Sequence, residues 1–157
     1  DKPERFPGYE RLLRRKRREY DNQEQPFSEM TENTQLADWI GCFQYWDAQN
    51  HAYIHLNPLQ SHDVNLTLQK RYAFLQWEQG SGKTPAAIFT GKYRWDAGLV
   101  HSIWVISSAI SIRNNWDVIL KGAGFSYVFV ERLADLQRIR PGDFVILPPE
   151  ETRKLLK

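Results

Sequence analysis

The residues Gly80, Ser81, Gly82, Lys83 and Thr84 have types and a spacing that suit one definite chemistry. Triphosphate is a dense anion, and a loop that binds it needs converging backbone N–H groups. Glycine permits this because no Cβ blocks the approach. Lys83 would reach the β- and γ-phosphates, and the Thr84 hydroxyl would ligate the Mg²⁺ that bridges them. The spacing therefore predicts a site for a nucleoside triphosphate and magnesium.

The neighbouring sequence supplies the elements that such a loop needs. The apolar run from Tyr72 to Trp77 predicts a strand before it, and Pro85 to Thr90 predicts a helix after it. The first N–H groups of that helix and its positive dipole end would face the phosphates, and Pro85 suits a first turn because it has no N–H. The full phosphate-loop pattern also asks for glycine where Trp77 stands, so a purely structural Gly-Ser turn is the alternative interpretation.

The rest of the chain alternates between β-prone and helix-prone segments, which predicts an α/β fold with a parallel sheet and helices on both faces. Nucleotide would then bind at the carboxyl ends of the strands. The expected segments are a helix at 36–46, a turn at 47–50, a strand within 51–56, a connection at 92–98, a strand at 101–107, a helix from 108 to 116, a turn at 121–124, a strand at 125–130, a short helix at 131–139 and a strand at 143–147.

Composition limits the class of protein. The chain has 157 residues, of which 41% are hydrophobic and 13% aromatic, and this predicts one main domain with a substantial core. Cys42 is the only cysteine, so no disulfide can form within the chain. No apolar run approaches the ~20 residues of a membrane span, and the basic N-terminus is unlike a secretory signal. We expect an intracellular protein, in the cytoplasm or nucleus of a host, with no membrane partner.

Basic residues are concentrated near the N-terminus. Residues 1–20 hold eight Lys or Arg and only four Asp or Glu, and residues 10–20 predict a short basic helix. Such a cluster binds nucleic-acid phosphates through counterion release, while a solvated arm without a partner is the alternative. The residues that would make these contacts are Arg14, Arg15, Lys16, Arg17 and Arg18.

Two segments resemble a known family. Residues 56–60 read Leu-Asn-Pro-Leu-Gln, and residues 78–84 read Glu-Gln-Gly-Ser-Gly-Lys-Thr. Together they are similar to the N-terminal RecA-like lobe of superfamily-two helicases and translocases, most closely the Swi/Snf-like branch with its compact viral and phage members. The family's loop does not require the glycine that Trp77 replaces. The resemblance implies that ATP is bound, with Mg²⁺, by Gln60, Glu78, Gln79, Gly80, Ser81, Gly82, Lys83, Thr84 and Pro85, and that Lys83 and Thr84 take part in catalysis.

In this family the glutamine of the upstream segment reads adenine, which is the role that the resemblance implies for Gln60. A side-chain amide suits this role by its chemistry, because adenine presents one donor and one acceptor to it. The family's motif after the second strand contacts the backbone of one nucleic-acid strand. Ser107, Ser108 and Arg113 occupy that place, although Ser108-Ala109 replaces the usual proline-containing turn. DNA is favoured over RNA as the partner.

The acidic motif that holds magnesium in such ATPases is missing from its expected place. Two prolines, Pro148 and Pro149, stand where an Asp-Glu pair would begin. We therefore expect a basic arm at 1–35 and an incomplete RecA-like domain at 36–157, with the acidic strand and a second RecA-like lobe beyond Lys157. Such a piece would bind ATP but not turn it over alone. The alternatives are a phage packaging-type ATPase, a small phosphate-loop kinase, or a non-enzymatic module that binds nucleotide or nucleic acid.

Overall fold

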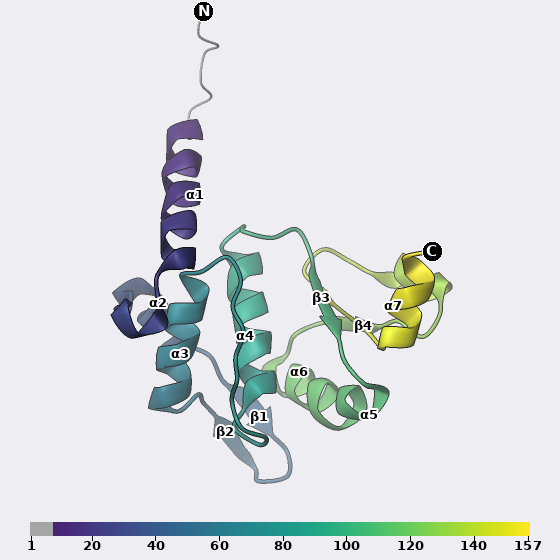
Figure 1. The fold of residues 1–157 in the computed structure, drawn as a ribbon. Helices are drawn as coiled ribbons and strands as arrows, with labels where there is room; N and C mark the ends of the chain where they lie inside the picture. The colour runs from purple at the N-terminus through teal and green to yellow at the C-terminus, as the bar shows by residue number, and fades with distance from the viewer. Residues whose placement is uncertain (1–7) are drawn as a thin grey trace, which may run out of the picture.

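Helices alternate with short strands in the computed structural model, which describes residues 8–157 (Figure 1). The α-helices are α1 (Tyr9–Glu24), α2 (Thr34–Gly41), α3 (Pro58–Leu68), α4 (Lys83–Asp96), α5 (Ala109–Ser111), α6 (Asp117–Ala123) and α7 (Pro149–Leu155). The strands are β1 (Tyr45–Asp47), β2 (Ala52–Ile54), β3 (Ile103–Ile106), β4 (Tyr127–Phe129) and β5 (Phe144–Leu147). Short helical turns are η1 (Phe27–Glu29), η2 (Ile112–Trp116) and η3 (Leu133–Arg138), of which η2 has π-helical hydrogen bonding. Among these helices, none has both the length and the apolar character needed to cross a membrane.

The centre of the fold is a three-stranded parallel sheet in the order β3-β5-β4. All four residues of β5 are buried, and successive side chains of a strand point to opposite faces. Phe144 and Ile146 therefore pack with residues of α4 and α6, while Val145 and Leu147 pack on the other face with residues of η3 and α7. The chain is thus a mixed α/β protein, and the predicted parallel sheet is confirmed.

Stacked aromatic rings join the helices of the first half to this sheet. The rings of Phe43 and Phe89 are stacked with centroids 4.7 Å apart, and those of Phe125 and Phe144 are stacked at 6.1 Å. Phe89 meets Phe125 edge-on at 6.4 Å. Aromatic pairs of this kind contribute beyond their buried area, so they fix the position of α4 against β5.

Helix α1 projects from the body of the protein and buries none of its residues (Figure 1). Its last turn is nevertheless anchored, because the buried ammonium of Lys70 donates to the carbonyl oxygens of Gln23 and Gln25, at 2.9 and 2.6 Å. The Asn22 amide donates to the Gln69 carbonyl at 3.2 Å. Carbonyls at a helix C-terminus lack intrahelical partners and carry partial negative charge, which explains how a buried cation is accommodated here. The first seven residues of the predicted arm lie outside the described residues.

The predicted strand at 72–77 is wrong. This segment is irregular and runs beside helices, without a strand of the sheet next to it (Figure 1). The carbonyl oxygens at its two ends accept hydrogen bonds from side chains: Gln23 donates to the Tyr72 oxygen and Lys83 donates to the Trp77 oxygen. A strand needs a neighbouring strand for its N–H and C=O groups, and without one the apolar composition of the segment cannot make it β-structure.

Three predicted boundaries are also wrong. The helix expected at 36–46 ends at Gly41, because Tyr45–Asp47 pairs with Ala52–Ile54 in an antiparallel hairpin. The Asp47 carboxylate accepts from the backbone N–H groups of Gln49 and Asn50, a local turn that holds the hairpin and confirms the turn at 47–50. Residues 92–96, expected as a connection, continue α4, where Tyr93 packs edge-on against Trp39 of α2 at 5.6 Å. Residues 121–123 likewise belong to α6, not to a turn.

The carboxylate of Asp135 organises η3 and gives a test of this part of the fold. It accepts from the backbone N–H groups of Glu131 and Arg132, at 2.9 and 3.1 Å, and from Arg138 at 2.9 Å. The backbone bond from Glu131, with smaller contributions from Arg132 and Arg138, lowers the pKa of Asp135 below its ordinary value of 3.8. The ionised form therefore stabilises the folded state at pH values above 3.8, and this contribution is lost as the pH falls through the lowered folded pKa.

We predict that Asp135→Ala lowers the free energy of unfolding near neutral pH and that its difference from the wild type shrinks below pH 3.8. Urea denaturation at a series of pH values measures this difference. Asp38→Ala, which removes an exposed carboxylate from α2, is the control for the substitution itself. A difference that stays constant through the acidic range would contradict the role of the ionised carboxylate.

Candidate functional site

The phosphate-loop candidate is a glycine turn that leads directly into α4. Gly80 and Gly82 both have left-handed backbones, with φ of 80° and 84°, a conformation that side chains with a Cβ rarely adopt. The Ser81 N–H and hydroxyl both bind the Glu78 carbonyl oxygen, at 3.2 and 2.5 Å, which closes the turn. Gly82 caps α4 without a side-chain acceptor, so the first N–H groups of the helix remain open to an anion.

Lys83 and Thr84 occupy the first turn of α4, as the predicted site requires. The ammonium of the exposed Lys83 donates to the Trp77 carbonyl oxygen at 2.7 Å, so it lies across the beginning of the loop. Thr84 is half-buried, and Pro85 behind it is buried. The lysine therefore lies beside the open N–H groups, with a single neutral carbonyl as its acceptor. A phosphate oxygen could replace this carbonyl as the acceptor.

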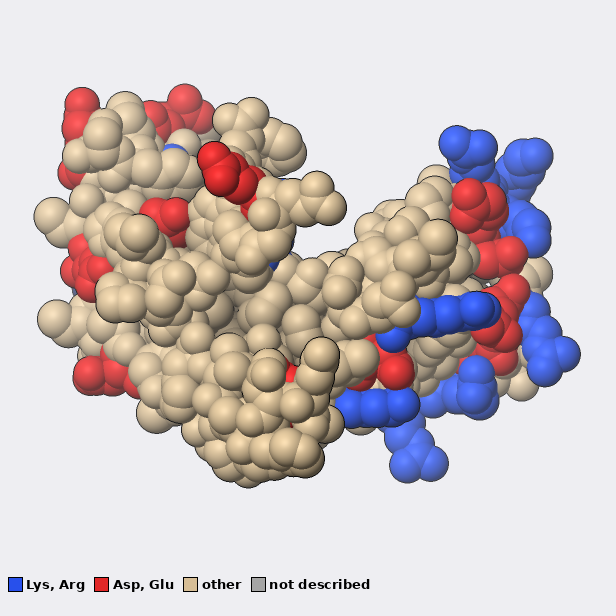
Figure 2. All heavy atoms as spheres, turned by 90° about the horizontal axis from the view of Figure 1, so that it is seen from below, with Lys and Arg blue, Asp and Glu red and all other residues tan. Residues whose placement is uncertain are grey.

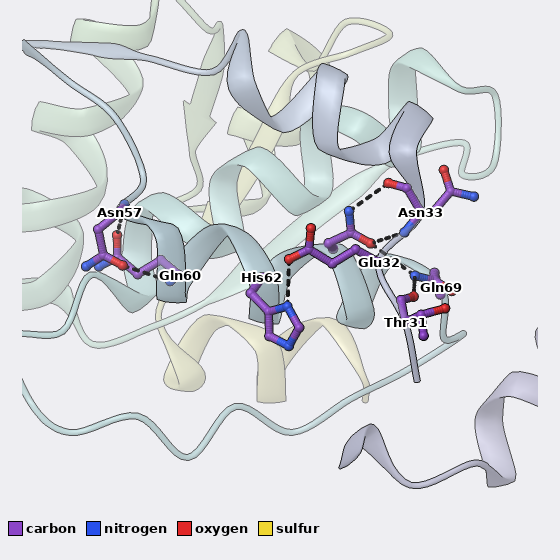
Figure 3. A network of polar contacts seen from close by, with 8 residues as sticks. Thr31, Glu32, Asn33, Asn57, Gln60, His62 and Gln69 are labelled. Carbon is purple, nitrogen blue, oxygen red and sulfur yellow. Dashed lines mark hydrogen bonds and ion pairs between the residues drawn. The ribbon is translucent and has the colours of Figure 1, made fainter. Parts of the chain in front are cut away.

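The structure brings Gln60 to the loop across 21 positions of sequence, because its Nε2 donates to the Ser81 carbonyl oxygen at 2.6 Å. The other end of the same amide belongs to a capping box at the start of α3 (Figure 3). There, Oε1 accepts from the Asn57 N–H at 2.9 Å and the Asn57 side chain accepts from the Gln60 N–H at 2.8 Å. The amide thus has partners within the protein at both ends.

Helix α3 is itself held by polar contacts to residues 31–33 (Figure 3). The links are His62 Nδ1 to Glu32 Oε1 at 2.6 Å, Asn33 N–H to Asn65 Oδ1 at 2.9 Å, Asn65 Nδ2 to the Asn33 oxygen at 2.9 Å, and Gln69 Nε2 to the Thr31 oxygen at 3.0 Å. Asn65 is almost completely buried at 1% exposure, and these partners satisfy its amide. Because α3 is tied along its length, it is a rigid support for the loop that touches its first turn.

The chain between α3 and the loop returns antiparallel along the same helix. The Trp77 Nε1 donates to Asp63 Oδ2 at 2.8 Å, one turn beyond the contact of Gln60 with Ser81. At the far end, the Arg94 guanidinium of α4 donates to the carbonyl oxygens of Lys70 and Arg71, both at 2.9 Å. Side chains of α3 and α4, not a β-ladder, therefore position the entry to the loop.

The predicted nucleic-acid residues after β3 have mixed surroundings. The Ser107 N–H donates to the Leu147 carbonyl oxygen at 3.3 Å, which extends the pairing of β3 with β5 by one residue. The Ser108 hydroxyl accepts from the Ser111 N–H at 3.3 Å and so caps α5. Arg113, on η2, is exposed. Ser108 therefore has a structural role in the chain, and both Ser108 and Arg113 are exposed.

The predicted basic residues of α1 do not all share one face. Arg14, Arg15 and Arg18 line a shallow concavity of about 430 Å³ together with Arg11, which the sequence analysis did not select. The four positions recur at the i, i+3, i+4 and i+7 spacing of one helix face. Lys16 lines a second concavity of about 310 Å³, beside Arg94 of α4. Arg17 lines neither of these two concavities.

A second group of basic side chains lies on the side of the protein that carries the C-terminal elements, interleaved with acidic ones (Figure 2). Sequence reasoning missed this group because its members are dispersed through the last 26 positions. Its exposed members are Arg132, Arg138, Arg140, Arg153, Lys154 and Lys157. Arg138 and Lys154 are paired with Asp135 and Glu151, at 2.9 and 2.7 Å, so the group is less basic than its Lys and Arg content suggests.

Comparison with known proteins identifies no relative: no protein-family model, no curated protein and no solved structure matches the chain. Across residues 8–157, no three side chains of His, Cys, Asp or Glu lie together as metal ligands. Functional inferences therefore depend on the contacts of the chain's own residues.

The two loop glycines provide a matched test of the contact between Gln60 and the loop. A Cβ on Gly80 would meet nothing within 4 Å, whereas a Cβ on Gly82 would overlap the Gln60 amide. Both substitutions cost roughly 1–2 kcal/mol of stability because the backbone is left-handed. We predict that Gly82→Ala costs more than Gly80→Ala in chemical denaturation, and that this excess disappears in a Gln60→Ala background. Equal costs for the two variants would contradict the contact.

Proposed function

We propose that this chain is the ATP-binding lobe of a nucleic-acid-dependent ATPase, a helicase or a DNA translocase with a RecA-like fold. The observation that carries the proposal is the loop geometry: two left-handed glycines precede α4, with Lys83 at its first position and Gln60 holding the loop from α3. A bland glycine turn needs neither the lysine nor the tether from a distant helix. These features suit a triphosphate, and they occur here without the strand that was expected before the loop.

In this proposal the protein's contribution is mainly electrostatic. The N–H groups from Gly80 to Thr84 and the positive end of α4 bind phosphate oxygens. Lys83 exchanges the Trp77 carbonyl, now at 2.7 Å, for a phosphate oxygen. Mg²⁺, when bound, would neutralise phosphate charge beside the Thr84 hydroxyl. Glu78, Gln79 and Pro85 shape the turn and the first helical turn.

Two groups that ATP hydrolysis requires are not among the residues assigned to this site. An acidic residue that orients water and an arginine that stabilises the transition state are both required for turnover. We propose that they lie on a further strand and on a second RecA-like lobe, so that residues 8–157 bind ATP without hydrolysing it. Catalysis by Lys83 and Thr84 then depends on that second lobe.

Nucleic acid is the proposed partner of this ATPase, with DNA favoured. The arginine face of α1 and the exposed Arg113 are suited to phosphate contacts, which fix position without reading sequence. Ser107 and Ser108 would add hydroxyl contacts near Arg113, between β3 and η2 and away from α1. Figure 1 places α1 at the opposite end of α3 from the phosphate loop, so nucleic acid bound to α1 would not overlap the nucleotide.

A non-enzymatic module is the second candidate, and the arginine face of α1 favours it specifically. Four arginines share one helix face that buries no residue, and this face does not involve the phosphate loop. A protein that only recruits nucleic acid or an acidic partner would need this face alone. The two candidates differ in whether the loop binds nucleotide.

We predict that Lys83→Ala weakens Mg²⁺-dependent binding of a fluorescent ATP analogue by about 10- to 100-fold, because a charge-assisted contact is worth about 1.5–3 kcal/mol. Fluorescence titration measures the dissociation constant. Lys154→Ala removes an equal charge from α7, on the other face of the sheet, and should leave binding unchanged. Equal binding by the wild type and Lys83→Ala would reject nucleotide binding by this loop. The second candidate, a non-enzymatic module that recruits nucleic acid or an acidic partner, would then be favoured.

Adjacent arginines of α1 test the nucleic-acid surface. We predict that Arg18→Gln lowers the slope of log affinity against log salt concentration by about 1, since one phosphate contact is lost. Arg17→Gln makes the same change of charge outside the Arg11, Arg14, Arg15 and Arg18 face and should leave the slope unaltered. Titration with duplex DNA at several salt concentrations distinguishes them. Identical slopes for the two variants would mean that net charge, not this face, governs binding.

A further inference from the structure

A basic concavity lies in the angle between α1 and the end of α4. It measures about 310 Å³, and its basic lining residues are Arg15, Lys16, Lys70, Arg71 and Arg94. Among the described residues that line it, Glu19 is the one carboxylate, and its Oε1 lies 3.7 Å from Arg15 Nε. Five cations against one carboxylate give this concavity a positive field that attracts a polyanion.

The five cations of this concavity have two different roles. Lys70 and Arg94 donate to backbone carbonyls at 2.6 to 2.9 Å and so hold α1 and the chain at Arg71 in place. The Lys16 ammonium and the Arg71 guanidinium make no hydrogen bond or ion pair within residues 8–157, and both residues are exposed. Lys16 and Arg71 are therefore available to a ligand, in a place that their neighbours make rigid.

The basic concavity continues the arginine face of α1. Arg15 lines both, and Arg11, Arg14 and Arg18 share that face with it. From Arg11 to Arg18 the face extends ~10 Å along the helix, at 1.5 Å per residue. A planar guanidinium binds phosphate oxygens in pairs, and a nucleic-acid strand presents phosphates at regular intervals. One phosphate backbone therefore suits the face and the angle together.

A second concavity, lined by amide side chains, adjoins the basic one. It measures about 350 Å³ and shares Arg15, Glu19, Leu68 and Leu99 with the basic concavity. A side-chain amide offers donors and an acceptor that match the edge of a nucleobase. The amides that line this concavity belong to Asn22, Asn33, Gln35 and Gln69.

Several groups of these amides are open to a ligand. Gln35 is exposed, and its side chain makes no hydrogen bond within the described chain. Asn22 uses its Nδ2 on the Gln69 carbonyl at 3.2 Å, and Asn33 uses its Oδ1 on the Leu36 N–H at 3.1 Å. The Asn22 Oδ1 and the Asn33 Nδ2 have no partner among residues 8–157. The amide-lined concavity therefore presents both donors and acceptors next to the free cations.

This combination selects between possible polyanions. An acidic protein segment would need the cations alone and would leave the amides without a role. In a duplex the base edges are paired inside the stack, whereas an unpaired strand can turn a base outward while its phosphates stay on a basic surface. Adjacent sites for phosphate and for a base edge therefore favour a single strand.

We propose that the angle between α1 and α4 binds single-stranded nucleic acid, with its phosphates on the arginine face of α1, Lys16 and Arg71 and a base in the amide-lined concavity. This inference rests on the nucleic-acid partner of the proposed function and specifies the form of that partner. It assigns contacts to Arg71 and Gln35, which lie outside α1, and makes Lys70 a positioning residue.

Arg71→Gln tests the phosphate contact, because it removes the charge and keeps the backbone groups of residue 71 that bind Gln23 and Arg94. We expect the slope of log affinity against log salt concentration, measured with a single-stranded DNA oligonucleotide, to fall by about 0.7, since one single-strand phosphate contact is lost. Arg140→Gln removes an exposed charge between η3 and β5 and should leave the slope unchanged. Fluorescence anisotropy at several salt concentrations measures the slopes, and urea denaturation confirms that the variants are folded.

Gln35→Ala tests the base contact, with an abasic strand of the same length as the probe that lacks bases. The variant should bind the mixed-sequence single strand about 2- to 10-fold more weakly than the wild type, the loss of one hydrogen bond. Both proteins should bind the abasic strand equally. Gln137→Ala, which removes an exposed amide from η3, should bind both strands like the wild type.

The outcomes separate this site from the proposed function. If Arg18→Gln lowers the salt slope while Arg71→Gln and Gln35→Ala behave like the wild type, the angle is not part of the site and the proposed function stands. The single-strand assignment is overturned if Gln35→Ala weakens binding of duplex DNA as much as binding of the single strand. Polyglutamate that binds with the same dependence on Arg71 would assign the angle to an acidic protein partner instead.

Nucleotide binding is measured independently of this site, through Lys83 and the fluorescent ATP analogue. Wild-type protein that binds ATP but no nucleic acid would overturn the single-strand site and the nucleic-acid dependence of the proposed ATPase. Binding of the single strand through Arg71 and Gln35, without any binding of ATP, would support the site and overturn the proposed ATPase.

Discussion

The amide of Gln60 is the contact on which the arrangement of the candidate site depends. The capping box with Asn57 fixes its rotamer at the start of α3, and the same side chain then holds the Ser81 carbonyl at 2.6 Å. A loop with two left-handed glycines has large conformational freedom when unfolded, so ordering it is entropically costly. One short hydrogen bond to a helix that is itself tied to residues 31–33 offsets part of this cost and places Lys83 at the first turn of α4.

Two cations, the buried Lys70 and the half-buried Arg94, hold the other end of the same segment through backbone carbonyls. The Lys70 ammonium donates to carbonyls at the end of α1 and also lies 4.8 Å from the ring centroid of Phe27. Arg94 donates to the carbonyls of residues 70 and 71, and burial lowers the pKa of its guanidinium while the nearby Glu19 opposes this shift. Charges that are partnered by backbone dipoles in this way are costly to remove, because the carbonyls would be left unsatisfied. The contacts of Lys70 and Arg94 therefore position both α1 and the start of the segment that leads to the loop.

Sequence reasoning succeeded where a local signal determines the structure. The helix that begins after Ser108, the parallel strands, and the glycine turn before α4 all follow from residue types a few positions apart. Helix α3 and its cap at Asn57 were not expected. It failed for residues 72–77 because β-structure is a property of a pair of strands, and no composition reveals that the neighbour is absent. The same error concealed how the loop is supported. Because residues 72–77 were assigned to the sheet and residues 58–68 to no helix, the contacts of Gln60 with Ser81 and of Asp63 with Trp77 could not be foreseen.

The irregular segment before the loop has a consequence for how the protein opens. Within the described chain, the backbone groups of residues 73–76 make no hydrogen bonds, whereas the central strand β5 is paired on both sides, with β3 and with β4. Amide hydrogen exchange at these positions is therefore governed by local opening and not by global unfolding, so they exchange before the sheet does. A molecule that rests against this segment would register first as slowed exchange at four amides, with the rest of the protein unchanged.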